Sequence, residues 1–160
     1  MIGAELLSSQ TLAVGWLIYV PVLIWAICRA PWVELFTDSR RQHLLFGTVF
    51  ALFLLWLVRR DFDTGVSYHF IGMTAVTLLL DWPLALVGGL VAQLGLVLLG
   101  RQDLAAVGVN GALLIALPVL VTECCAILVE RAQPRNPFVY IFVSGFFAAA
   151  LSALLCLLLA

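Results

Sequence analysis

Long apolar runs separated by short polar segments dominate the sequence. Six of these runs approach the roughly 20 residues that an α-helix needs to cross a bilayer. They cover residues 11–28, 43–58, 66–80, 84–99, 104–129 and 138–160. The pattern predicts an all-α fold, a polytopic membrane helix bundle with about six transmembrane helices. It contains no sign of a second domain, so we expect one integral membrane domain over residues 1–160.

The composition supports lipid as the surrounding solvent. Apolar residues make up 64% of the chain and charged residues 11%, whereas soluble domains lie nearer one half and one quarter. In lipid, backbone groups must be satisfied within helices or a closed barrel. A barrel would show short alternating segments, and the unbroken runs favour helices. The net charge of −1 gives no electrostatic basis for binding nucleic acid.

The distribution of arginines predicts an orientation. Five lie in the connections after the first, third and fifth runs, and three lie in the other connections. The positive-inside rule then places both termini outside the cytoplasm, in a multi-pass protein of a bacterial-type inner membrane. In the first connection, residues 31–36 combine Pro31, Trp32, Leu35 and Phe36, which predicts a stretch lying along the membrane interface.

Two further features bear on helix packing. Gly88, Gly89 and Gly95 in the fourth run permit close approach of a neighbouring helix. Pro118 lies within the fifth run, where its missing N–H predicts a kink or a division into two parts.

Ionisable and amide side chains within apolar runs are candidates for function, because their burial in a membrane is costly. His69 follows a glycine-containing turn, and Met73 lies one helical turn further along the same face. A neutral imidazole can bind a transition metal, with Met73 as a substitute ligand. A structural alternative is an interfacial histidine hydrogen-bonded to a neighbouring helix.

Four other polar residues are candidates, and two of them, Asn110 and Glu123, have both structural and functional interpretations. Asn110 can cap a break, bridge two helices or orient His69 as an outer-sphere partner. Glu123 can take part in an ion relay or pair with an arginine near the interface. Gln93 is expected to bridge helices, and Asp81, just before Pro83, is expected to cap the next helix.

The chain carries no motif for nucleotide binding or hydrolysis. We therefore expect no catalytic residues, no tightly bound cofactor and no enzyme activity. The four cysteines have no CxxC spacing and are expected to act as small buried apolar residues.

Three ordered motifs resemble a known family. Residues 65–72, GVSYHFIG, resemble the G-[TV]-S-x-H-x-x-G signature of the membrane subunits of cobalt and nickel energy-coupling-factor transporters. Residues 78–85 are similar to that family's Leu-rich run ending in Gly-Pro-Trp-Ala, and residues 106–110 to its Ala-Leu-Gly-x-Asn. The resemblance implies a substrate-capture permease that binds Ni²⁺ or Co²⁺ as substrate on the outer side. It also implies a membrane coupling subunit and cytoplasmic ATPases as partners.

The family's ligands are the N-terminal amine, a histidine at position two with its backbone amide, and the motif histidine. The resemblance therefore assigns His69 and the amine of Met1 to the metal site. Position two of this chain is Ile2, so one imidazole of a square-planar nitrogen site is missing. The site can be completed by Glu5, Asn110 or Met73, or it can favour Cu⁺ through His69 and Met73.

The remaining possibility is that the metal site is lost. The chain would then be a non-transport helical subunit that stabilises or assembles a larger complex of other membrane subunits.

Overall fold

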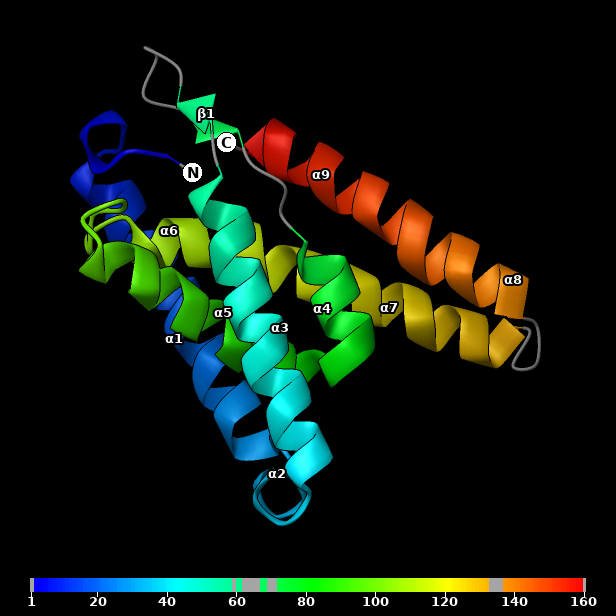
Figure 1. Cartoon of the computed structure of the whole chain (residues 1–160). Helices are drawn as coiled ribbons and strands as arrows, with labels where there is room; N and C mark the ends of the chain where they lie inside the picture. Colours follow the sequence, from blue (N-terminus) through cyan, green and yellow to red (C-terminus); the bar gives the residue numbers. More distant parts are fainter. Residues whose placement is uncertain (1, 59, 62–66, 69–71, 133–136, 160) are drawn as a thin grey trace.

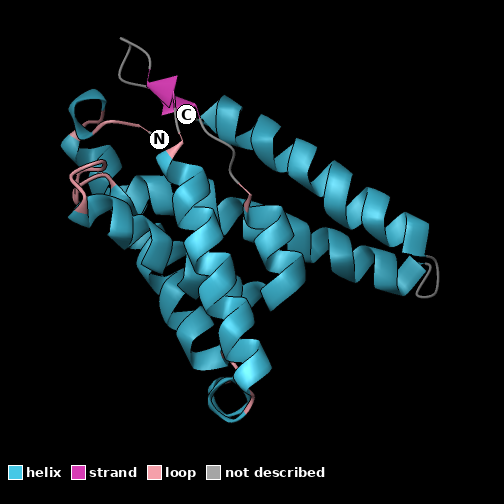
Figure 2. Ribbon diagram, in the orientation of Figure 1, coloured by secondary structure: helices cyan, strands magenta, loops and turns pink. Residues whose placement is uncertain are grey.

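Helices make up nearly all of the described structure, a computed structural model of the chain (Figures 1 and 2). Residues 2–58, 60–61, 67–68, 72–132 and 137–159 are described. The helices are η1 (Ala4–Leu6), α1 (Ser9–Arg29), α2 (Trp32–Thr37), α3 (Ser39–Leu57), α4 (Met73–Leu80), α5 (Trp82–Leu98), α6 (Val107–Gly111), η2 (Ala112–Ala116), α7 (Leu117–Ala132), α8 (Pro137–Val139), η3 (Tyr140–Phe147) and α9 (Ala148–Leu159). Two short strands, β1 (Arg60–Asp61) and β2 (Ser67–Tyr68), pair antiparallel.

Three stretches of helix are long and apolar enough to cross a bilayer, judged over the described residues. They are Ser9–Arg29, Val107–Arg131 and Tyr140–Leu159, and the apolar helix Trp82–Leu98 is shorter. These helices make the chain a multi-pass membrane protein. The predicted all-helical membrane fold is confirmed, while six remains an approximate number of spans.

The region predicted to form the third span differs from the expectation. Its helix, α4, begins only at Met73 and has 8 residues, about 12 Å of the roughly 30 Å that a span requires. Ser67 and Tyr68 instead form β2. Gly72 precedes α4 with a φ of 67°, a left-handed conformation that glycine adopts without steric cost.

Pro118 does not divide the fifth run. The chain continues from α6 through the π-helix η2 into α7 without a break. In η2 the N–H of Leu117 donates to the carbonyl of Ala112, so the next bond of this pattern would run from residue 118 to Leu113. Pro118 has no N–H to donate. The thiol of Cys156 in α9 donates to the Leu113 carbonyl at 2.9 Å instead, which gives this carbonyl the partner that it needs in lipid.

The bundle has two parts that share α7. One part packs α1, α3, α4 and α5 around a core that includes Tyr19, Trp56, Met73 and Leu86. In the other, α7 and the η3–α9 helix lie side by side as a hairpin, whose α8 end projects to the right in Figure 1. The N-terminal segment and the β1–β2 pair lie at one end of the molecule, and α2 lies at the opposite end.

Candidate functional site

The N-terminal segment is attached to α6 by the side chain of Asn110. The Ile2 N–H donates to Asn110 Oδ1 at 2.9 Å, and Asn110 Nδ2 donates to the Ile2 carbonyl at 3.0 Å. Both polar atoms of the Asn110 amide therefore bond to the backbone of the same residue, Ile2. Asn110 is completely buried, so these bonds replace hydration that the side chain has lost.

Close packing against α1 fixes the position of α6. A β-carbon on Gly15 would lie 2.6 Å from the Val109 backbone nitrogen, and one on Gly108 would lie 2.7 Å from the Trp16 ring. Only glycine permits helices to cross at this distance. The Trp16 indole also donates to the Ala105 carbonyl at 3.2 Å. Asn110 thus projects from a backbone with little freedom to shift.

Gln93 adds a third helix to this arrangement. Its Nε2 donates to the Val107 carbonyl at 3.2 Å, which joins α5 to α6. The predicted role of Gln93 as a bridge between helices matches this bond.

Met73 is the first residue of α4 and is completely buried. A β-carbon on Gly89 would lie 3.2 Å from its terminal methyl group, so the side chain packs closely against α5. Its carbonyl accepts from the Thr77 hydroxyl at 2.7 Å. These contacts account for Met73 as a core residue, and its proposed role as a substitute ligand remains a prediction.

The two principal ligands expected from the sequence, His69 and Met1, lie outside the described residues. Their neighbours are described: β2 ends at Tyr68, directly before His69, and Asn110 holds Ile2, directly after Met1. Both of these neighbouring segments lie at the same end of the molecule in Figure 1. Within the described part of the chain, no three His, Cys, Asp or Glu side chains gather as a metal site would require.

The other histidine lies far from this end. His43 is exposed near the start of α3, where its Nδ1 lies 3.3 Å from the Ser39 hydroxyl. α3 begins beside α2, at the end of the molecule opposite the N-terminal segment (Figure 1). The two histidines of the chain therefore belong to segments at opposite ends of the molecule.

Ile2, at the position where the resemblance implies a second imidazole, has an apolar side chain that is buried. Glu5 lies nearby in sequence and is exposed in η1, and its carboxylate folds back over Gly3. Of the three residues that the sequence offered to complete the site, Asn110 is thus the one bonded to residue 2.

A family model decides the classification. The model for the cobalt uptake substrate-specific transmembrane region matches residues 2–160. The chain belongs to this family. The match confirms the resemblance drawn from the three sequence motifs, and it makes the chain a membrane component of metal uptake.

Solved structures agree on the fold of this cobalt uptake family member. A truncated transition metal transporter has 22% identity and a TM-score of 0.77, with coverage of 97% of this chain and 71% of that one. A second transition metal transporter has 21% identity and a TM-score of 0.74, with coverage of 97% and 67%. No curated protein matches.

Two expectations for polar and thiol side chains are corrected by the structure. Asp81 makes no side-chain capping bond to α5, and it adopts a φ of 67° instead. Cys28 and Cys124 are exposed on their helices, while Cys156 is buried as expected. The bond between Asn110 and Ile2 was missed because no local pattern links residues 108 positions apart.

Proposed function

We propose that this chain is the substrate-binding membrane subunit of an energy-coupling-factor transporter for Ni²⁺ or Co²⁺. The ion is captured on the outer side of the membrane, near His69 and the amine of Met1. The observation that carries the proposal is the pair of hydrogen bonds between Asn110 and Ile2. These bonds hold the residue next to the N-terminal amine against a rigid helix, and such preorganisation of ligands favours metal binding.

The described neighbours of His69 support the same location. β1 and β2 pair with Arg60 opposite Tyr68, which fixes the backbone one residue before His69. Imidazole and amine nitrogens suit Ni²⁺ and Co²⁺. The ion is the substrate of this subunit. Its delivery across the membrane also requires a membrane coupling subunit and cytoplasmic ATPases.

Metal binding to the purified protein tests the site. Calorimetry with Ni²⁺, Co²⁺ and Cu⁺ should show affinity falling at least about tenfold in His69→Ala, as expected when one ligand is lost. His43→Ala is the matched control, because it removes the other histidine at the opposite end, and its affinity should equal that of the unmodified protein. Equal affinities for His69→Ala and the unmodified protein would refute the site.

The second candidate is a non-transport subunit that assembles a larger complex. The burial of Ile2 where the family has a histidine favours it. Purification in mild detergent separates the two functions. Recovery of ATPase subunits with the chain supports transport, whereas recovery of an unrelated membrane enzyme without ATPases supports assembly.

A further inference from the structure

α2 follows a helix that is long and apolar enough to cross the hydrocarbon core of a membrane. α1 has 21 residues before Ala30, about 31 Å of helix, which matches the roughly 30 Å of the hydrocarbon core. One turn before the end of α1, Trp25 packs on Trp82 with ring centroids 4.4 Å apart. Tryptophan gathers at this boundary in membrane proteins. The chain then turns through α2 and returns in α3.

Hydrogen bonds to both neighbouring helices hold α2 in one orientation. The Trp32 indole donates to the Ile27 carbonyl of α1 at 2.7 Å, and Gln42 Nε2 of α3 donates to the Phe36 carbonyl at 3.1 Å. Leu35 is buried and points into the bundle. The opposite face of α2 is therefore fixed as an outer surface.

Two large apolar side chains occupy this outer surface. Val33 is 78% exposed and Phe36 is 73% exposed. They are three residues apart, so they lie on the same face of the helix. The Trp32 ring stacks on Phe36 with centroids 6.3 Å apart. Val33 and Phe36 nevertheless stay largely exposed, whereas Leu35 between them is buried.

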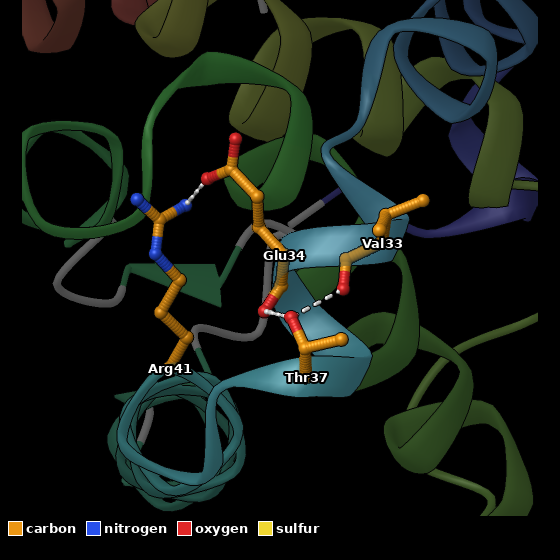
Figure 3. A network of polar contacts seen from close by, with 4 residues as sticks. All are labelled: Val33, Glu34, Thr37 and Arg41. Carbon is orange, nitrogen blue, oxygen red and sulfur yellow. Dashed lines mark hydrogen bonds and ion pairs between the residues drawn. The ribbon is translucent and has the colours of Figure 1, made fainter.

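The acidic groups around α2 already have partners within the protein. Glu34 Oε2 pairs with Arg41 at 2.7 Å, and Figure 3 shows this pair together with Thr37, whose hydroxyl bonds the Val33 and Glu34 carbonyls. Asp38 Oδ1 accepts from the backbone N–H of Arg40 at 2.8 Å.

One arginine on each side of α2 is exposed and can bind an anion. Arg29 ends α1 and Arg40 lies in the first turn of α3, and both are exposed. Over the described residues, neither makes an ion pair. Exposed apolar side chains beside unpaired arginines complement the acyl boundary and phosphates of an anionic lipid surface.

We propose that the outer face of α2, formed by Val33 and Phe36 and flanked by Arg29 and Arg40, binds the anionic phospholipid surface of the membrane. Val33 and Phe36 enter the boundary between headgroups and acyl chains. Arg29 and Arg40 bind lipid phosphates, with their apolar stems lying along the same boundary. This binding fixes the depth and tilt of α1 and α3, a role separate from metal capture at the other end.

An environment-sensitive fluorophore on a single cysteine tests the proposal. The background carries Cys28→Ala, Cys124→Ala and Cys125→Ala and keeps the buried Cys156. The label is attached at Val33→Cys, with Glu34→Cys on the polar side of α2 as the matched control. Both proteins are placed in nanodiscs of phosphatidylcholine, with or without phosphatidylglycerol, and quenched with neutral acrylamide. Melting temperatures establish that both variants are folded.

We expect quenching at residue 33 to be roughly threefold weaker than at residue 34, because the label lies in the lipid boundary. Phosphatidylglycerol should weaken the quenching at residue 33 further. The double variant Arg29→Gln/Arg40→Gln should abolish this dependence on phosphatidylglycerol. Equal quenching at residues 33 and 34 would overturn the proposal. Shielding of residue 33 that does not change with phosphatidylglycerol would also overturn it. Shielding that arises only when partner subunits are added would do the same, because it would identify a protein as the occupant.

Discussion

Asn110 and Ile2 are joined by two hydrogen bonds of 2.9 and 3.0 Å, although 108 residues separate them in the sequence. The bonds run in opposite directions, so the amide side chain pairs with the backbone much as a neighbouring strand would. This pairing ties the start of the chain to a helix that crosses α1 at close range.

Asn110→Ala should release the N-terminal segment. Each lost bond costs about 1 kcal/mol, so we expect hydrogen exchange at the Ile2 amide to become at least about tenfold faster. Asn110→Asp keeps the acceptor and loses the donor. Its exchange rate at the Ile2 amide should lie between the rates of the unmodified protein and Asn110→Ala. Gln10→Ala, on the exposed first turn of α1, serves as the control. Unchanged exchange in Asn110→Ala would show that other contacts hold the segment.

Ile2→His should strengthen Ni²⁺ binding, because it supplies the imidazole that the family resemblance implies at position two. We expect an increase in affinity of about tenfold or more, measured by calorimetry, since each added ligand contributes strongly to a nitrogen site. Ile2→Gln gives a polar side chain of similar length without an imidazole and should bind no better than the unmodified protein. An equal gain in both variants would mean that the burial of Ile2, and not its missing nitrogen, limits binding.

Cys156→Ala should destabilise the junction of η2 and α7, because the Leu113 carbonyl loses its donor. A buried unpaired carbonyl costs about 1–3 kcal/mol, which thermal unfolding in detergent would detect. Cys156→Ser keeps a donor, so it should lower the stability less than Cys156→Ala does. Pro118→Ala restores a backbone N–H, so the loss from Cys156→Ala should shrink in that background. Additive effects of the two substitutions would contradict this coupling.

Gly111→Ala should destabilise the crossing of α1 and α6. The added methyl group would overlap the Tyr19 ring, and overpacking of this kind costs about 1–3 kcal/mol. Gly47→Ala in α3 is the control, because nothing lies within 4 Å of that position and alanine favours helix. We expect a lower melting temperature in the first variant and an equal or higher one in the second. Equal melting temperatures would refute the close crossing.

Asp81→Gly should stabilise the protein. Asp81 has a φ of 67° and a ψ of 157°, a region adopted almost only by glycine that costs other residues about 1–3 kcal/mol. The family motif has glycine in the corresponding run. Asp81→Ala removes the charge and keeps the β-carbon, so it should recover none of this strain energy. A similar rise in melting temperature for both variants would attribute the effect to charge.

The sequence determined that lipid surrounds the protein and that the fold is helical. Unbroken apolar runs leave backbone groups that only helices satisfy in lipid, and the runs at residues 11–28 and 84–99 correspond closely to α1 and α5. Gly88 and Gly89 were correctly expected to allow close approach, because β-carbons there would meet Val49 and Ile115. The family itself followed from three short motifs, since their order and spacing are properties of the chain alone.

Tertiary structure decided how the run containing Pro118 is built and what the N-terminus contacts. Hydropathy predicts that the fifth run is helical, but it carries no information on the shift to π-helical bonding before Pro118. That shift is tolerated because Cys156, from another helix, reaches the free Leu113 carbonyl. Likewise, Asn110 could have bonded any neighbour until packing of α6 against α1 brought Ile2 within reach. Both contacts join distant residues, and their geometry exists only once the helices have packed.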